Sequence, residues 1–249
     1  MRIDQLLVER ALAASRSQAQ RLVAAGVRWR LPGGAWRNAT KNGDEVPEAA
    51  ELALLDTAET RFVSRGGLKL EGALDRVGLP VTGLRCLDVG QSSGGFTDCL
   101  LQRGAAQVVG VDVGSGQLHP SLRGDARVVC IEHLNARDLT PAAVGAPPLF
   151  DLIVGDLSFI SQTLVWPALV PLMAPGGHGL TLVKPQFELQ PADIGKGGLV
   201  RDEAAYPRVQ ARVTEALSGL GLSVLDYFDS PITGGDGNRE FFIHVRRAP

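Results

Sequence analysis

Short apolar runs that alternate with amphipathic or turn-forming segments limit the fold of this chain more than any other feature of its sequence. The runs, which follow residue 64, are Arg85–Val89, Val108–Val111, Val128–Ile131, Leu152–Val154 and Gly179–Val183. Each is rich in β-branched residues or leucine, and runs of this kind separated by helical segments are typical of βαβ units. The sequence therefore predicts an α/β domain with a doubly wound, Rossmann-like parallel sheet.

Two more strand-like runs, Ser223–Phe228 and Glu240–Val245, lie near the C-terminus. They are close enough in the sequence to pair as an antiparallel hairpin. A parallel sheet that ends in such a hairpin fits the methyltransferase variant of the doubly wound fold better than the dinucleotide-binding variant.

The first sixty residues have a different pattern, which predicts two short helices. Apolar residues recur there at helical spacing, and they are Ile3, Leu6, Leu7, Ala19, Leu22 and Val23. The second helix is expected to begin after Ser15, whose hydroxyl can cap the free amides while Gln18 reaches back to complete a capping box. Gly26 can supply the left-handed residue that ends this helix.

Short β-like segments, Val27–Arg30 and Glu51–Leu55, follow the helices around a Pro-Gly-Gly turn. Two helices and a hairpin of this size bury too little surface to build a catalytic domain on their own. The polar segment 56–62 lacks periodicity and marks a domain boundary. We therefore expect a small α+β domain over residues 1–60 and a larger domain over residues 64–249.

Charge is distributed unevenly between these two domains. The whole chain carries a net charge of −2, but residues 1–41 contain eight Arg or Lys and only two carboxylates. A compact basic segment on an acidic body is typical of a protein that binds a polyanion. Chance clustering of solvated arginines is the alternative. Because aromatic residues make up only 5% of the chain, we do not expect stacking to be the main means of recognition.

The composition disfavours several classes of protein. The three cysteines, Cys86, Cys99 and Cys130, form no CxxC pair, so we expect neither a disulfide framework nor a zinc cluster, and no metal site. The N-terminal segment is charged and amphipathic, unlike a signal peptide. No apolar stretch approaches the roughly 18 residues that a membrane span needs. We expect a soluble, reduced, cytoplasmic protein that does not enter membranes.

A glycine-rich turn follows the first predicted strand of the larger domain, in C-L-D-V-G-Q-S-S-G-G-F-T at 86–97. Glycines let backbone amides approach a ligand where a Cβ atom would block it. Gly90, Gly94 and Gly95 do not form G-x-G-x-x-G, so a pyrophosphate site is weakly supported. The next strand ends at Asp112, where a carboxylate can accept hydrogen bonds from both hydroxyls of a ribose. A tight turn without a ligand is the alternative.

S-adenosylmethionine fits this pattern, because it has a ribose and a cationic sulfonium but no phosphate. Asp88 beneath the turn would complement the positive charge. Asn135 would lie beside the adenine, with a simple turn-forming role as its alternative. The residues expected to bind the cofactor are Asp88, Gly90, Ser93, Gly94, Gly95, Phe96, Thr97, Asp112 and Asn135.

Four charged residues are candidates for catalysis, namely Lys69, Asp156, Lys184 and Glu240. Asp156 and Lys184 directly follow predicted strands, at the edge where ligands bind in open α/β sheets. Each residue alone could be a solvated or ion-paired side chain. Together they would favour a neutral Lys184, because a neighbouring Lys69 ammonium and partial burial both oppose its charge. The amine could then accept the proton of a hydroxyl that attacks a methyl group, with Asp156 and Glu240 holding the groups in line.

The N-terminal domain resembles the S4 domain, an RNA-binding fold, in R-I-D-Q-L-L at 2–7, S-R-S-Q-A-Q-R-L-V at 15–23 and G-V-R at 26–28. It departs from that family in W-R-L-P-G-G-A-W-R at 29–37, where a tighter V-N-G turn is usual. The resemblance implies contacts to RNA phosphates and shape rather than to base edges. The residues expected to make them are Arg2, Arg16, Gln20, Arg21, Arg28 and Arg65, each with a solvated surface position as its alternative.

Over essentially its whole length the chain resembles the TlyA (hemolysin A) family, which joins an S4 domain to an FtsJ-like methyltransferase domain. The matching motifs are F-V-S-R-G-G-L-K-L-E-G-A-L, D-V-G-Q-S-S-G-G-F-T-D, V-D-V-G-S-G-Q-L-H, G-D-L-S-F-I-S, L-V-K-P-Q-F-E and G-N-R-E-F-F. The family's Lys-Asp-Lys-Glu tetrad falls on the four candidate catalytic residues. The resemblance implies methyl transfer from S-adenosylmethionine to a ribose 2′-oxygen of ribosomal RNA, often of a cytidine. Gln91 and His119 depart from the family pattern.

Three other functions stay open from the sequence. A non-catalytic RNA-binding or ribosome-assembly factor would share the basic segment but has no need of the four candidate catalytic residues. A membrane-active haemolysin is disfavoured because no long apolar span is found, and a nicotinamide enzyme is disfavoured by the glycine spacing.

Overall fold

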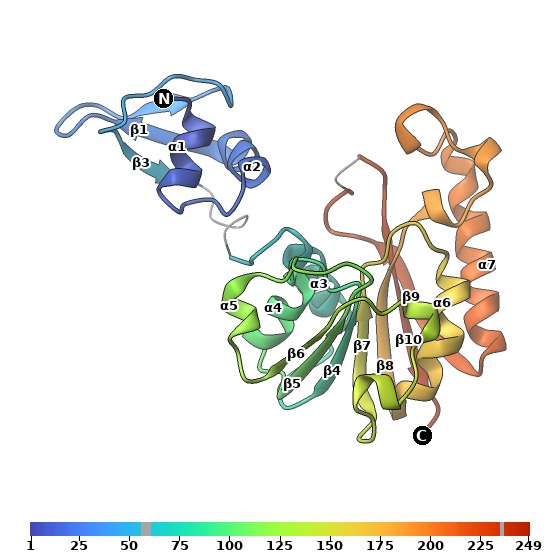
Figure 1. The fold of residues 1–249 in the computed structure, drawn as a ribbon. Coiled ribbons are helices and arrows are strands. Elements are labelled where there is room, and N and C mark those ends of the chain that lie inside the picture. The colour runs from blue at the N-terminus through green and yellow to red at the C-terminus, as the bar shows by residue number, and fades with distance from the viewer. Residues whose placement is uncertain (56–60, 235–236) are drawn as a thin grey trace. The chain divides into compact units, whose positions relative to one another are not determined.

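The computed structural model describes residues 1–55, 61–234 and 237–249, and the chain divides into two compact units, Met1–Arg65 and Gly66–Pro249 (Figure 1). Most of the boundary expected at residues 56–62 lies outside the described residues. All four candidate catalytic residues belong to the second unit. That the first unit is an S4 domain stays a prediction.

The first unit consists of two helices and a three-stranded antiparallel sheet. The helices are α1 (Ile3–Glu9) and α2 (Arg16–Gly26), and the strands, in sheet order, are β2 (Arg37–Ala39), β1 (Val27–Arg30) and β3 (Glu51–Leu54). Ser15 caps α2 as predicted, because its Oγ accepts a hydrogen bond from the backbone N–H of Gln18 at 3.3 Å. The Gln18 side chain reaches one residue further back than a capping box requires, and accepts from the Ala14 N–H at 2.6 Å.

The core of this unit lies between the two helices and one face of the sheet. Ile3 of α1 and Leu22 of α2 are fully buried there, against Val27 of β1. The short strand β2 was not among the predicted segments. Only its last residue, Ala39, is buried, so its sequence carries no alternation of apolar and polar residues that could reveal a strand.

A seven-stranded sheet organises the second unit. Its strands are β4 (Arg85–Val89), β5 (Gln107–Val111), β6 (Val128–Ile131), β7 (Phe150–Gly155), β8 (Met173–Val183), β9 (Leu222–Asp229) and β10 (Phe241–Arg247), in the spatial order β6-β5-β4-β7-β8-β10-β9. The strands from β6 to β8 pair in parallel, and β10 runs antiparallel to both β8 and β9. The predicted doubly wound, Rossmann-like sheet with an antiparallel C-terminal hairpin is therefore confirmed.

Helices cover both faces of this sheet (Figure 1). They are α3 (Gly66–Val77), α4 (Gly95–Gln102), α5 (Pro120–Arg123), α6 (Gln162–Leu169) and α7 (Tyr206–Gly219). Because successive strand residues point to opposite faces, Asp88 and Phe242 meet α4, whereas Val89 and Phe241 pack on the side of α7. Single 3-10 turns are found at Ala136–Asp138, Ala142–Val144, Val170–Leu172, Pro185–Phe187, Pro191–Asp193, Lys196–Gly198 and Glu203–Ala205.

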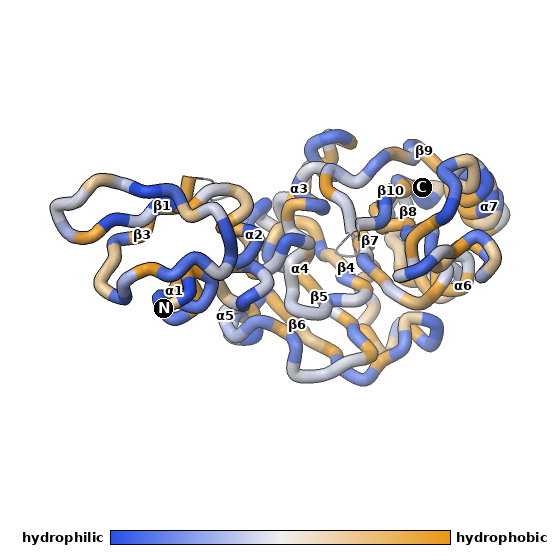
Figure 2. The backbone as a smooth tube through the Cα atoms, turned by 90° about the horizontal axis from the view of Figure 1, so that it is seen from above, coloured by the Kyte–Doolittle hydropathy of each residue, from blue (hydrophilic) through white to orange (hydrophobic). Residues whose placement is uncertain are grey.

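The hydrophobic core of the second unit lies on these two faces, and Figure 2 shows hydrophobic residues following the central strands. Its largest fully buried side chains are Trp166 of α6, Phe150 of β7 and Phe242 of β10. Across residues 1–55, 61–234 and 237–249, no helix is both long enough and apolar enough to cross a membrane.

Candidate active site

The carboxyl ends of three neighbouring parallel strands, β4, β7 and β8, meet at one edge of the sheet, and Gly90, Asp156 and Lys184 follow them directly. A pocket of about 460 Å³ opens at this edge. Its lining is made by Gly90, Ser92, Val111, Asp112, Val113, Gln117, Leu134, Asn135, Ala136, Asp156, Leu157, Ser158, Phe159 and Ile160. The pocket therefore combines the glycine turn, the end of β5 and the segment that carries Asp156.

The glycine turn is tight because it passes against the backbone of the next strand. Gly90 has φ of +84°, and a Cβ atom there would lie 2.8 Å from the carbonyl oxygen of Asp156. Gly94, which precedes α4, has φ of +93°. These conformations favour glycine on steric grounds, and they let the turn approach both the pocket and Asp156.

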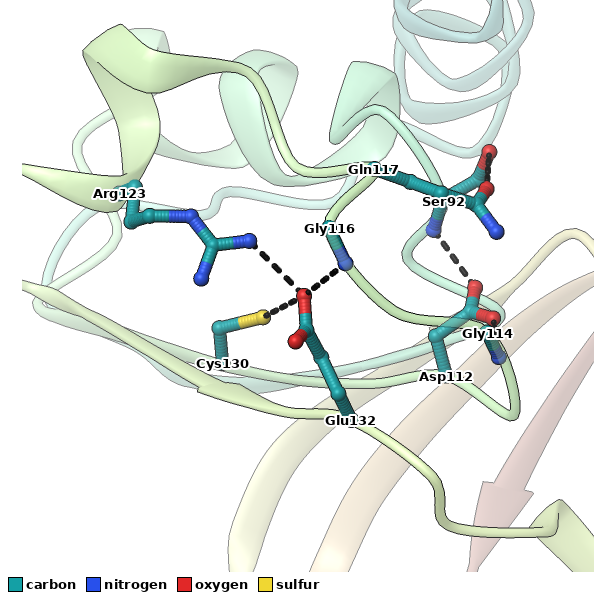
Figure 3. Close-up of polar contacts among 8 residues, drawn as sticks. All are labelled: Ser92, Asp112, Gly114, Gly116, Gln117, Arg123, Cys130 and Glu132. Carbon is teal, nitrogen blue, oxygen red and sulfur yellow. Dashed lines mark hydrogen bonds and ion pairs between the residues drawn. The ribbon is translucent and has the colours of Figure 1, made fainter.

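Asp112 lies in the pocket wall, and both of its carboxylate oxygens are held by backbone amides (Figure 3). Oδ2 accepts from the N–H of Ser92, and Oδ1 accepts from the N–H of Gly114, each at 2.7 Å. A carboxylate oxygen can accept two hydrogen bonds, so each oxygen keeps one acceptor site for a ligand. The orientation of this carboxylate is thus fixed by the chain before any ligand binds.

Sequence reasoning missed Glu132, which holds the next loop in place (Figure 3). Its Oε1 accepts from the Gly116 N–H and from Arg123, both at 2.8 Å. The hydrogen bond from Arg123 lowers the pKa of Glu132 below its usual value. Because this loop also carries Gln117, a lining residue bonded to Ser92, Glu132 indirectly shapes the pocket. A carboxylate directly after β6 is the sequence signal that could have found it.

Asp88 lies beneath the turn and does not line the pocket. It is 1% exposed, and its Oδ2 accepts a hydrogen bond from Thr97 Oγ1 at 2.7 Å. Thr97 in turn accepts from Gln91 Nε2 at 2.9 Å. Burial raises the pKa of Asp88 to about 7, although the Thr97 hydrogen bond opposes this. Gln91 is accommodated because Gly110 leaves room for its side chain, which accounts for one departure from the family pattern.

Other expected cofactor residues also support the turn rather than line the pocket. The Phe96 ring stacks on Phe242 of β10 at 6.2 Å between centroids, and Ser93 accepts a backbone hydrogen bond from His119 at 3.2 Å. Gly94 and Gly95 form the start of α4. Of the remaining expected residues, Gly90, Asp112 and Asn135 line the pocket, and Asn135 also caps the following 3-10 turn by accepting from the Arg137 N–H.

The four candidate catalytic residues come together from four separate elements. Lys69 of α3 donates to Glu240 Oε2 at 2.6 Å, and its Nζ lies 3.6 Å from Asp156 Oδ2. Lys184 Nζ lies 2.6 Å from Asp156 Oδ1 and donates to Ser158 Oγ at 2.9 Å. The result is a chain of alternating charges, in the order Glu240, Lys69, Asp156 and Lys184. Asp156 is the only member of this chain that also lines the pocket.

Asp156 lies between the two lysines, which differs from the arrangement that we expected. Burial alone would raise the pKa of Asp156, but the ammonium groups of Lys184 and Lys69 hold it below its usual value. Asp156 thus separates Lys184 from Lys69, whose ammonium group was expected to lie next to Lys184.

Two aromatic side chains at the rim of the pocket were also missed. Phe159 is 90% exposed, has φ of +64° and lies 5.0 Å from the Phe187 ring. Both border a second hollow beside the first. An exposed phenylalanine in a left-handed conformation is uncommon, and no sequence pattern indicates it.

The residues expected to bind RNA have varied surroundings in the first unit. Arg2, Arg16 and Gln20 all contact Asp4, a fully buried carboxylate. The hydrogen bond from Arg2 is the main cause that lowers the pKa of Asp4 to about 2. The Arg2 and Arg16 side chains remain 42% and 53% exposed. They can therefore position the helices and still face solvent.

The other three expected RNA contacts lie elsewhere in this unit. Arg21 donates to the backbone carbonyl of Ser17, Arg28 donates to Asn38 at 3.1 Å, and Arg65 is partly buried. Their RNA contacts stay predictions. In the part of the chain that the structure describes, no group of three His, Cys, Asp or Glu could hold a metal ion.

Comparison with known proteins connects this geometry with a family. Residues 62–247 match the FtsJ-like methyltransferase family. The chain is 45% identical to the 16S/23S rRNA (cytidine-2′-O)-methyltransferase TlyA of Mycobacterium tuberculosis, over 98% of this chain and 89% of that protein. It is 35% identical to Hemolysin A of Brachyspira hyodysenteriae, over 98% of this chain and 99% of that protein.

Solved structures agree with this comparison. A hemolysin-named protein of Streptococcus thermophilus superposes with a TM-score of 0.77 and 39% identity, covering 100% of this chain and 88% of that one. An S-adenosylmethionine-dependent methyltransferase of Mesorhizobium loti shares the fold, with a TM-score of 0.52 and 17% identity over 72% of this chain and 98% of that one.

Proposed function

Because this chain belongs to the FtsJ-like methyltransferase family, and within it to the TlyA proteins, we propose that it methylates ribosomal RNA at the 2′-oxygen of a cytidine ribose. The observation that carries this proposal is the buried chain of charges from Glu240 to Lys184 beside a pocket at the edge of the sheet. A non-catalytic RNA-binding protein would have no use for two lysines held at one pocket by carboxylates.

The methyl donor in this proposal is S-adenosylmethionine, bound in the pocket at the glycine turn. Asp112 supports this, because its fixed carboxylate has one acceptor site left on each oxygen for the two hydroxyls of a ribose. The tight turn at Gly90 brings backbone close to the same space. When bound, the cofactor would supply an electrophilic methyl group on a cationic sulfonium.

In the proposed reaction, Nζ of Lys184 would accept the proton of the 2′-hydroxyl as that oxygen takes the methyl group from the sulfonium, and the donor would leave as a neutral thioether. This step requires a neutral Lys184. Asp156, which lines the pocket, holds Lys184 at its edge, with its Oδ1 2.6 Å from Nζ. Lys69 and Glu240 hold Asp156 in place from the other side.

The test is methylation of isolated ribosomal subunits with a labelled methyl donor, followed by mapping of the modified ribose. Lys184→Ala should abolish methylation and still be stabilised by S-adenosylmethionine in a thermal shift assay. Lys196→Ala, which removes an exposed lysine from a 3-10 turn, is the matched control and should stay active. Turnover by Lys184→Ala would exclude Lys184 as the proton acceptor, and methylation of a base instead of a ribose would overturn the proposed reaction.

A further inference from the structure

The hairpin formed by β1 and β2, here called the tryptophan hairpin (residues 27–41), has an unusual composition. It contains four Arg or Lys, counting Arg28, and no Asp or Glu, together with two of the three tryptophans of the chain, Trp29 and Trp36. This is also the segment in which the chain departs from the S4 pattern. Neither the pocket nor the charge chain accounts for these residues, which lie in the first unit.

Each indole of the hairpin lies against a guanidinium group. The Arg30 guanidinium is 4.5 Å from the Trp36 ring centroid, and that of Arg37 is 5.3 Å from Trp29. Arg30 is also held by Glu51 of β3 at 2.6 Å. Contacts of this kind limit the rotation of the Trp36 ring, so that a partner would meet an aromatic surface already in place.

The tip of the hairpin is exposed although it is apolar. Trp36 is 41% exposed and Leu31 is 47% exposed. The two helices pack on the opposite side of β1, where Val27 is buried, while Arg28 and Asn38 face solvent. Because Arg30 lies two residues after Arg28, both arginines belong to this outer face, and Trp36 lies beside them.

We propose that Trp36 stacks on an unpaired base of RNA, while Arg28 and Arg30 contact the phosphates that flank it. The inference rests on the proposed function, in which the substrate is RNA, and it adds a site that the S4 resemblance does not supply. An unpaired base exposes its aromatic face, whereas a base within a duplex is covered by its neighbours. A hairpin rich in cations and without a carboxylate complements a polyanion rather than an apolar protein surface.

The test measures binding of the full chain to a short, unstructured oligocytidylate and to an RNA duplex of equal length. Trp36→Ala should weaken binding to the single strand about tenfold, which is within the range measured for loss of one stacked base. Trp36→Phe should retain most of the affinity. Trp36→Lys separates stacking from charge, because stacking predicts weaker binding and simple charge attraction predicts tighter binding.

Fluorescence gives an independent readout of the same contact. Trp166 is fully buried in the second unit, so RNA bound to the first unit should not change its fluorescence. A base stacked on Trp36 should quench the fluorescence of Trp36, and Trp36→Phe should lose most of that quenching. The inference would be overturned if Trp36→Ala kept the wild-type affinity or if Trp36→Lys bound more tightly. It would also be overturned if Trp36→Ala weakened binding to the single strand and to the duplex by the same factor. A wild-type chain that binds neither RNA would instead overturn the proposed function. Retained RNA affinity of Trp36→Phe and an unchanged circular dichroism spectrum of every variant check that the first unit, which carries the substitution, remains folded.

Discussion

Replacing the buried Asp88 with asparagine should change how the stability of this protein depends on pH. Asp88 is 1% exposed, and burial raises its pKa from 3.8 to about 7. Between these two values the folded chain retains a proton that the unfolded chain has lost, so the free energy of unfolding falls as pH rises. The decrease amounts to as much as about 1.4 kcal/mol per pH unit, or about 4 kcal/mol over the whole window.

Asp88→Asn removes this titration and preserves most of the local contacts. An asparagine oxygen can still accept the hydrogen bond from Thr97. The new amide group carries a cost of about 1–3 kcal/mol if it finds no acceptor, but that cost is the same at every pH. The difference in slope between variant and wild type therefore isolates the carboxyl group, whatever the absolute stabilities are.

The assay is urea unfolding of the full chain at a series of pH values from 4 to 8, followed by circular dichroism. The free energy of unfolding of wild type should fall relative to that of Asp88→Asn as pH rises to about 7, the pKa of Asp88 in the folded chain. Above that pH the two curves should become parallel. Asp138→Asn, which changes an exposed aspartate, is the control and should follow wild type. Parallel curves for wild type and Asp88→Asn would refute the reasoning, because they would mean that Asp88 ionises normally in the folded protein.

Three further predictions concern the charge chain, the cofactor and the first unit. Glu240→Gln should destabilise the protein by about 3 kcal/mol, since it removes one partner of a buried pair, and Lys69→Met in the same chain should restore most of that loss in urea unfolding. Isothermal titration should show that the preference for S-adenosylmethionine over S-adenosylhomocysteine, which lacks the sulfonium charge, increases from pH 6 to pH 8 in wild type but not in Asp88→Asn, because only the ionised carboxylate attracts the sulfonium. Deleting residues 1–60 should weaken RNA binding and reduce its salt dependence, by about 0.7 in the logarithmic slope for each single-strand phosphate that the shortened chain no longer neutralises.

Each of these has an outcome that would contradict it. A double variant of Lys69 and Glu240 as unstable as Glu240→Gln alone would show that the cost does not come from an unpaired lysine. A preference for the charged cofactor that is independent of pH in wild type would separate Asp88 from the sulfonium. An unchanged salt slope after deletion would show that the basic first unit does not contact RNA.

The sheet could be predicted because its signal is local. Short runs rich in β-branched residues, such as Val128–Ile131, favour strands through their own composition, and the structure has strands at all the predicted positions. The position of Asp112 directly after β5 followed from the same pattern, and its side chain lies in the pocket. Residues that end parallel strands share one edge of the sheet, so this part of the site is a consequence of topology.

Contacts between elements distant in the sequence could not be predicted in the same way. Asp4 looks like a solvated carboxylate among arginines, and only the packing of α1 against α2 buries it and brings Arg16 to it. The position of Asp156 between Lys69 and Lys184 likewise depends on how α3 meets the sheet. Sequence motifs identified the four residues of this cluster. They did not show the order of these residues in space, which decides which charges are neighbours.

Because Gly90 has no side chain, the glycine turn that borders the pocket can lie directly against the main chain of Asp156. A methyl group there would press on the main chain of Asp156 at 2.8 Å, so even alanine would push the carboxylate away from both lysines. Protein engineers who try to retune donor affinity at this position should find that turnover declines with it. Mutations that alter donor selectivity without loss of rate are better sought at other lining residues, such as Val113 and Leu134, which do not belong to the strand that leads to Asp156.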